Sequence, residues 1–309
     1  MILCCGEALI DMIPTPTKDG PDGFVPHTGG AVYNTAVALG RLGCQPAMLT
    51  GLSTDMFGQQ LKAGLEASKV ATNLVVEADR PTTLAFVQLR NGHATYSFYD
   101  ENSAGRMLEL QDMPDVPDDA EMLYFGGISL ACEPGADAYA DFLARNGASH
   151  AVMIDPNIRP GFIQDEARYR ARLDKMLGLS DIIKVSDEDL DWIVQGEAGL
   201  DEKAAALLQS GASLIIVTKG GDGASGYLAD GSQVSVPVTK VQVVDTVGAG
   251  DTFNAGVLAK LSELELLSKA SLKNMSAEQA ETALAFGAKV AAVTVSRAGA
   301  NSPWAHELT

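Results

Sequence analysis

Basic residues are scarce in this sequence. Lys and Arg total 22 against 40 Asp and Glu, which leaves a formal net charge of −18. A surface of that charge repels nucleic acids and anionic membranes, so neither is expected as a partner. It also constrains any phosphate-binding activity, because the positive potential must then come locally from backbone amides, a metal ion or a few placed lysines.

Cysteines and long apolar runs are scarce as well. The four cysteines, Cys4, Cys5, Cys44 and Cys132, include no C-x-x-C pair, which favours reduced, mostly buried thiols over a metal site. No apolar run approaches the ~20 residues that cross a bilayer. The first residues, MILCCGEALIDM, lack the basic start and long apolar stretch of a signal peptide. A cytoplasmic location is therefore expected.

Short apolar runs alternate with helical segments along most of the chain. With 46% hydrophobic residues, the sequence can bury a sizeable core. The alternation is typical of βαβ units and predicts an α/β fold, with a parallel sheet covered by helices on both faces. The expected strands lie at 1–5, 47–50, 122–125, 151–154, 182–185 and 214–218, and the expected helices at 34–42, 59–70, 136–146, 166–177, 188–194, 202–208, 252–263 and 277–295.

Two stretches break this alternation. Residues 11–27 are rich in Pro, Gly and Asp. Residues 83–90 and 94–99 alternate in the manner of antiparallel strands and are joined by Asn91-Gly92, a strong hairpin turn. We expect a small β excursion from the main sheet, which covers a ligand or is an edge hairpin without a role.

The most informative stretch is 245–251, D-T-V-G-A-G-D, between a strand-like run at 241–244 and the helix expected after it. Small residues let the backbone approach a ligand, and the first N–H groups of a helix form an anion site without any basic side chain. Asp251 would repel the anion, which suggests instead a base that deprotonates an attacking hydroxyl. The alternative is a plain glycine turn in which Asp251 stabilises the first turn of the helix.

Residues 245–258 resemble the C-terminal signature of the ribokinase-like (PfkB) family of carbohydrate kinases, D-T-x-G-A-G-D. Residues 29–43 resemble that family's first signature, GGAxxNxAxxLxxLG, with Val32 where Pro is frequent. The segments 6–11 and 51–58 are also similar. The likeness covers the chain to about residue 303.

The resemblance implies a Rossmann-like, mostly parallel sheet flanked by helices, in one ribokinase-like domain over residues 1–309. It also implies a small β lid, which we place at about 12–28 and 82–104. Lid hairpins of this family often pair between subunits, which suggests a homodimer.

The resemblance assigns the chemistry to the end of the C-terminal signature. Asp251 would be the catalytic base, and the amides of Gly248, Ala249 and Gly250 would form the anion hole for the phosphoryl group in transfer. Residues near the N-terminus would bind the sugar: Asp11, Gly29, Gly30 and Asn34. Asp11 is otherwise explained as a turn residue at a strand end.

The nucleotide side is expected from two further segments. Residues 184–189 resemble the family's N-x-x-E region, with Ser186 in place of Asn and Asp189 where Glu is usual, so that Asp189 or Glu188 would organise Mg²⁺ indirectly. The same segment is also an ordinary helix N-cap with an acidic first turn. The residues expected to bind ATP are Lys184, Ser186, Thr218, Gly220 and Gly223. Asp245, with residues 294–299, corresponds to a site that binds a monovalent cation such as K⁺ in some members.

The choice of sugar depends on fewer residues. The D-x-N-x-R run at 155–159 resembles that of bacterial fructokinases and 2-keto-3-deoxygluconate kinases. Arg159 would then contact the substrate or the phosphate; the alternative is a salt-bridged loop residue. Asp100 stands where the latter enzymes tend to carry an Arg for the substrate carboxylate, and an acid there would repel it. Ser129 replaces an acidic sugar contact of ribokinases. Phe98 is placed to pack on a sugar face or to fill the hairpin.

These residues predict an ATP-dependent kinase that phosphorylates the primary hydroxyl of a ketohexose, with fructose 6-phosphate as the product. One alternative is a 2-keto-3-deoxygluconate kinase with a rearranged lid. Another is a non-catalytic sugar-binding regulator on the same scaffold, against which Asp251 and the intact Gly-Ala-Gly argue. A GxGxxG dehydrogenase is discounted, because no such fingerprint follows the first strand.

Overall fold

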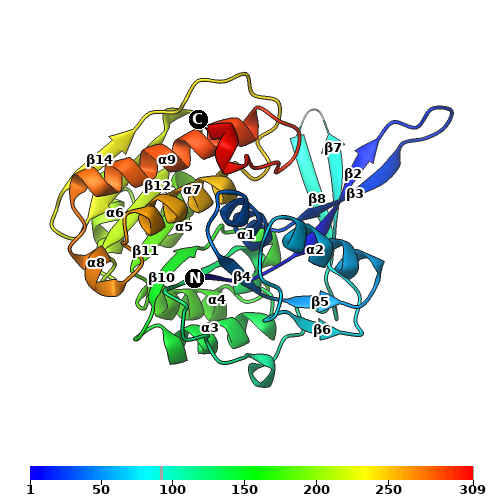
Figure 1. Cartoon of the computed structure of the whole chain (residues 1–309), viewed down its shortest axis with the longest axis horizontal. Coiled ribbons are helices and arrows are strands. Elements are labelled where there is room, and N and C mark those ends of the chain that lie inside the picture. Colours follow the sequence, from blue (N-terminus) through cyan, green and yellow to red (C-terminus); the bar gives the residue numbers. More distant parts are fainter. Residues whose placement is uncertain (91–92, 309) are drawn as a thin grey trace.

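The computed structural model describes residues 1–90 and 93–308 (Figure 1). Its main sheet has the order β14-β13-β12-β11-β10-β9-β1-β4. The strands from β12 to β4 are parallel, and β13 and β14 are antiparallel additions at one edge, which confirms the mostly parallel sheet. The bounds are β1 (Ile2–Cys5), β4 (Pro46–Leu49), β9 (Met122–Gly126), β10 (Ala151–Asp155), β11 (Ile182–Ser186), β12 (Leu214–Thr218), β13 (Ala224–Leu228) and β14 (Gln233–Val236).

Both faces of the parallel part of the main sheet are buried, which explains why its strands are continuous apolar runs in the sequence. Successive side chains of a strand point to opposite faces. In β1, Ile2 and Cys4 therefore belong to one core cluster, and Leu3 and Cys5 to the other.

The helices divide between these two cores. One face is covered by α1 (Ala31–Arg41), α2 (Met56–Ala67), α7 (Ala249–Glu263), α8 (Lys269–Lys273) and α9 (Ala277–Val295). The other is covered by α3 (Gly135–Asn146), α4 (Glu166–Leu177), α5 (Asp187–Ile193) and α6 (Leu200–Leu208).

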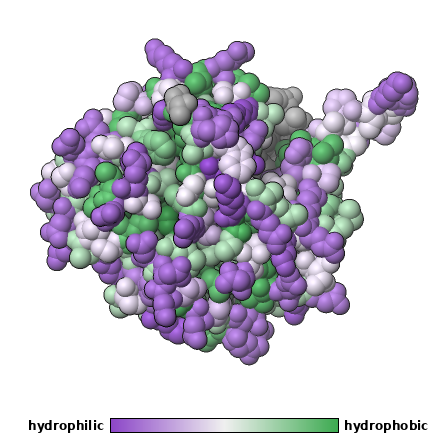
Figure 2. All heavy atoms as spheres, viewed as in Figure 1, coloured by the Kyte–Doolittle hydropathy of each residue, from purple (hydrophilic) through white to green (hydrophobic). Residues whose placement is uncertain are grey.

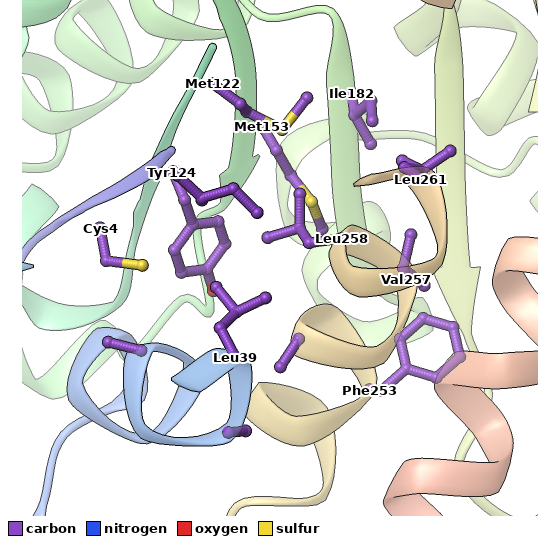
Figure 3. Packing of buried hydrophobic residues seen from close by; sticks show 14 of the residues in the cluster. Cys4, Leu39, Met122, Tyr124, Met153, Ile182, Phe253, Val257, Leu258 and Leu261 are labelled. Carbon is purple, nitrogen blue, oxygen red and sulfur yellow. The ribbon is translucent and has the colours of Figure 1, made fainter. Parts of the chain in front are cut away.

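Helix α7 is buried along most of its length, and this fixes the position of its N-terminus over the sheet. Figure 3 shows its side chains Phe253, Val257, Leu258 and Leu261 in the same cluster as the sheet residues Met153 and Ile182. A helix held in this way presents its first turn at a defined place, which a binding site requires.

A second, four-stranded sheet in the order β3-β2-β7-β8 stands at one side of the body (Figure 1). Its strands are β2 (Leu9–Thr15), β3 (Gly23–Gly29), β7 (Leu84–Arg90) and β8 (His93–Tyr99). The expected hairpin is thus present as the antiparallel pair β7 and β8, while its expected Asn91-Gly92 turn lies outside the described residues. The Pro- and Gly-rich stretch forms most of the antiparallel pair β2 and β3. Two short strands, β5 (Gly51–Ser53) and β6 (Val76–Ala78), form a further small sheet.

The expected strand at 241–244 is wrong. These residues are irregular backbone, and the side chains of Val243 and Val244 are 60% and 59% exposed. The sheet already ends at β14, so the segment has no strand to pair with; instead the N–H of Val244 donates to the carbonyl of Val295 at the end of α9, at 2.8 Å. The Gly-Ala-Gly turn therefore follows a loop.

Helices α1, α2 and α7 begin three residues earlier than expected. Before α1 and α7 stand Gly30 and Gly248, whose φ angles of 105° and 75° let the chain turn sharply into the helix. At α2, the Asp55 carboxylate caps the start by accepting from the N–H groups of Phe57 and Gly58. Both family-like glycine signatures are thus helix starts.

Polar residues are spread over the face of the molecule shown in Figure 2, including the projecting tip of β2 and β3, in keeping with the acidic composition. None of the helices in the described part of the chain combines the length and apolar character needed to span a membrane.

Candidate active site

Two hollows meet at the N-terminus of α7. The first, about 1090 Å³, is lined by most residues expected on the sugar side and by 246–251. The second, about 1360 Å³, is more apolar and contains three of the five residues expected on the nucleotide side, Thr218, Gly220 and Gly223. Thr246, Ala249 and Gly250 line both. The first turn of α7 is therefore the wall between them, where a group passing from one ligand to the other would be held.

The turn expected to bind an anion is shaped by glycine. At Gly248, the positive φ and a Cβ position 2.5 Å from the Ala300 Cβ leave room for no larger residue. The Ala249 N–H makes a long 3.3 Å bond to the Thr246 carbonyl, and the first N–H groups of a helix have no partner one turn back. The turn thus offers amide donors and the positive end of the α7 dipole to an anion.

Asp251 lies in the first turn of α7 and is almost buried. Asn34 Nδ2 donates to its Oδ2 at 2.8 Å, and the Thr35 hydroxyl donates to its backbone carbonyl at 3.1 Å, so α1 fixes both ends of the residue. Burial raises the pKa of Asp251 to about 7, and the bond from Asn34 opposes this shift. A carboxylate with such a pKa suits a general base near neutral pH.

The expected sugar-side residues come together around the first hollow. Asp11, Gly30, Asn34, Phe98 and Arg159 all line it. Burial raises the pKa of Asp11 to about 6. The Phe98 ring packs edge-to-face on the Phe162 ring at 4.3 Å, and Arg159 donates to the carbonyl of its neighbour Ile158, at 3.0 Å.

Gly29 has a different position from its neighbours, because it lies behind Asp11. A Cβ at Gly29 would stand 2.1 Å from Asp11 Oδ2. The absence of a side chain there is what allows the Asp11 carboxylate to occupy its place.

Glu7 is a buried acid of this site that sequence reasoning missed. Its two carboxylate oxygens accept from the N–H groups of Ala31 at 2.9 Å and Ser129 at 3.2 Å. A Cβ at Gly127 would lie 2.0 Å from its Oε1. Glu7 thus links the start of α1 to the helical turn at Gly127–Leu130 that follows β9. The sequence signal was an acid two residues after a buried strand.

The segment at 184–189 divides between two environments. Lys184 lines the first hollow, together with the first turn of α7. Ser186 and Asp189 form a capping box at the start of α5, and Asp189 Oδ1 also accepts from the Ile158 N–H at 2.9 Å, so both oxygens of Asp189 are engaged. Glu188 is exposed. Within residues 1–90 and 93–308, no group of three acidic, His or Cys side chains is arranged to hold a metal ion.

Asp245 joins the two segments expected to hold a monovalent cation. Its Oδ1 accepts from the Val247 N–H at 3.0 Å, and its Oδ2 accepts from the Gly299 N–H at 2.8 Å. The loop before α7 and the loop after α9 are therefore fixed side by side.

The expectation that Asp100 presents its charge to the substrate is wrong. Both its oxygens accept from Arg106 Nη1 at 3.1 Å, and the pair is largely buried. This ion pair borders a small neighbouring cavity, together with Ser129. The residues of β8 beside Asp100 could not predict this pairing, because Arg106 lies beyond the end of the strand. The neutralised Asp100 gives little discrimination against a carboxylate.

Comparison with known proteins agrees with this geometry. Residues 1–307 match a family model described as pfkB family carbohydrate kinase. The chain is 52% identical over 276 residues to a fructokinase of Rhizobium leguminosarum bv. trifolii, covering 89% of this chain and 84% of that protein.

Solved structures give the same result. A fructokinase from Xylella fastidiosa with bound ATP has a TM-score of 0.91 at 32% identity, covering 99% of this chain and 96% of that one. A double mutant of a Vibrio cholerae O395 fructokinase, with fructose, ADP and potassium ion bound, has a TM-score of 0.83 at 25% identity, covering 97% and 93%. The chain belongs to the pfkB family of carbohydrate kinases, which are phosphotransferases with an alcohol acceptor.

Proposed function

We propose that this chain is an ATP-dependent fructokinase, which transfers the γ-phosphoryl group to the 6-hydroxyl of fructose. The observation that carries the proposal is the wall shared by the two hollows. Asp251 faces the hollow that contains the sugar-side residues, while Ala249 and Gly250 before it line both hollows. The relatives named fructokinases support the choice of sugar.

In this proposal the sugar lies in the first hollow. The Asp11 carboxylate accepts hydrogen bonds from its hydroxyls, the Asn34 amide donates to them, and Phe98 packs on its face. Asp251 takes the proton of the 6-hydroxyl as that oxygen attacks phosphorus, and ADP leaves on the other side of the wall. The amides of Gly248, Ala249 and Gly250 stabilise the charge on the phosphoryl oxygens in transfer.

The nucleotide would lie in the second hollow, against Thr218, Gly220 and Gly223. Mg²⁺ neutralises phosphate charge when bound and is usually held by phosphates and water with few carboxylates. That fits a chain in which Asp189 is engaged and Glu188 is the exposed acid nearby. We also propose a K⁺ site beside Asp245, supported by its link to Gly299.

The four-stranded sheet would act as the lid and as a homodimer contact. An edge-to-face row of Phe24, Phe86 and Tyr99 supports this, because Phe24 and Tyr99 are 45% and 60% exposed. Light scattering after gel filtration should give twice the mass of one chain.

An ATP-coupled assay across fructose, 2-keto-3-deoxygluconate, ribose and nucleosides tests the proposed substrate. We expect turnover on fructose. 2-Keto-3-deoxygluconate is included because it carries a carboxylate, and the Arg106 guanidinium lines the cavity beside the proposed sugar site. Turnover on that sugar but not on fructose would overturn the proposal, and fructose binding without turnover would indicate a regulator.

We expect kcat/KM for fructose to fall as the pH is lowered through about 7. Only the ionised carboxylate of Asp251 can accept the hydroxyl proton, and burial raises its pKa to about 7. Well below that pH the loss should approach about tenfold per pH unit. The measurement is a kcat/KM profile from about pH 5.5 to about 8.5, and a profile that stays flat to the acid end would exclude this base.

Gly29→Ala is expected to raise the KM for fructose by about tenfold or more, because a displaced Asp11 loses a charged hydrogen bond to the sugar. The new Cβ would stand 2.1 Å from Asp11 Oδ2. The kcat should change little, since Asp251 is untouched. Gly161→Ala is the control, because its Cβ would meet nothing within 4 Å. Equal KM values for the two variants would show that Asp11 does not bind the sugar.

A further inference from the structure

A buried group of charged and polar side chains lies under the first turn of α7. Asp155 ends β10, Lys184 lies on the neighbouring strand β11, and Asn254 follows Asp251 by about one turn of α7. Asp155 Oδ2 accepts from Lys184 Nζ at 2.9 Å and from Asn254 Nδ2 at 2.7 Å. Their exposed fractions are 2%, 5% and 0%.

Stability alone does not explain this group. Removing two opposite charges from water costs free energy that their attraction often fails to recover, so a buried ion pair is weak evidence for stabilisation. Here Asp155 Oδ1 and Asn254 Oδ1 are also buried without a hydrogen-bond partner among the described residues. Unpaired buried acceptors carry a further cost. Such groups concentrate at functional sites.

The position of the Lys184 ammonium indicates what the group does. Its Nζ stands 3.4 Å from the place that a Cβ on Gly250 would occupy, which puts it against the proposed anion hole. Asp155 and Lys184 both line the first hollow. An ammonium has three N–H donors, and Asp155 takes one of them. The others remain for groups at the α7 N-terminus.

We propose that Asp155 and Asn254 are positioning residues that hold the Lys184 ammonium under Gly250, where it contacts the phosphoryl group in transfer and balances the charge of Asp251. The inference rests on the proposed kinase function. Lys184 is then a catalytic residue of the phosphoryl site rather than a nucleotide contact. It also supplies the local positive charge that a chain of net charge −18 needs there.

Several elements bring charged or titratable groups to Asp251. Around it stand Glu7 after β1, Tyr124 on β9, Asp155 on β10 and Lys184 on β11, with Asn34 of α1 hydrogen-bonded to it and Asp11 and Arg159 lining the same hollow. Among them, the Asp155 carboxylate raises the pKa of Asp251 and the Lys184 ammonium lowers it. Removing one or the other should therefore move the acidic limb of the activity profile in opposite directions.

The test compares Lys184→Met and Asp155→Asn with the natural chain in kcat, KM and the pH dependence of kcat/KM for fructose. We expect Lys184→Met to lower kcat at least ~10²-fold, the range for a lost transition-state donor, and to shift the acidic limb to higher pH. Asp155→Asn should lower kcat about tenfold, because Lys184 stays but is less firmly held, and should shift the limb to lower pH. The KM for fructose should change less than about threefold in both.

Lys203→Met is the matched control, because Lys203 is also a buried lysine paired with an aspartate, Asp191, at 2.8 Å. It should keep the natural kcat and pH profile. If Lys184→Met does not fold, Lys184→Gln keeps a donor for Asp155 without the charge and should give the same upward shift.

The inference would be overturned if the acidic limbs of Lys184→Met and Asp155→Asn shifted in the same direction, or if both variants kept the natural pH profile and kcat. The proposed function would still stand in that case, provided that the natural chain phosphorylates fructose. No fructose turnover by the natural chain would refute the proposed function itself.

Discussion

Asp251→Asn is expected to lower kcat for fructose at least ~10²-fold, the low end for a lost general base. The amide cannot accept the hydroxyl proton, yet its shape and its bond from Asn34 are kept. Fructose affinity should therefore change little. A coupled ADP assay at saturating fructose gives kcat, and titration calorimetry gives the affinity.

The same variant should be more stable than the natural chain at pH 8. A carboxyl whose pKa is raised by folding binds its proton more tightly in the folded state, so holding it ionised above about pH 7 costs stability. The Tm gain should shrink as the pH falls toward 5. Asp187→Asn, at an exposed first-turn position of α5, is the control and should lower Tm slightly. If Asp251→Asn behaved like Asp187→Asn in both kcat and Tm, Asp251 would be only a helix stabiliser.

Gly248→Ala is expected to lower kcat by about 10² to 10³, the range for a damaged oxyanion-type site. A Cβ there would stand 2.5 Å from the Ala300 Cβ, and the φ of 75° disfavours any side chain. The first turn of α7 must then shift, which moves the amides away from the phosphoryl group. Steady-state kinetics with ATP and fructose measures the loss.

Gly43→Ala separates this effect from general backbone strain. Gly43 also has a positive φ, of 90°, but a Cβ there meets nothing within 4 Å, and it follows the far end of α1. We expect a stability cost of about 1–2 kcal/mol with unchanged kcat. Equal kcat values for Gly248→Ala and Gly43→Ala would show that the turn at the start of α7 has no role in catalysis.

The parallel part of the fold could be predicted from the sequence because both faces of the sheet are buried. Its six parallel strands are apolar runs in the sequence, and the bounds of each lie within one residue of those expected. Strands β2 and β3 of the small sheet were harder to predict, because Pro14, Pro26 and the glycines hide their alternation. At 241–244 the valines favoured a strand that is not formed, because β-branched residues alone do not make a strand where no neighbouring strand is there to pair with.

The parts of the candidate site that lie within one short sequence motif could be predicted. The parts that depend on contacts between residues far apart in the sequence could not. The Gly-Ala-Gly turn and Asp251 are adjacent in sequence, so their joint placement followed from the helix start. Asp155 and Lys184 are 29 residues apart, and Glu7 and Ser129 are 122 apart. A helix N-cap with an acidic first turn was foreseen here as the plain alternative to a metal role, and the Ser186–Asp189 capping box has that form; metal binding there stays a prediction.

The most direct test of the central claim is the identity of the product. The chain is incubated with fructose, ATP and Mg²⁺, and phosphorus NMR of the mixture shows which oxygen carries the new phosphate. The proposed function predicts fructose 6-phosphate with the natural chain and only a trace with Asp251→Asn. Phosphate on another hydroxyl, or equal product from the variant, would contradict the account.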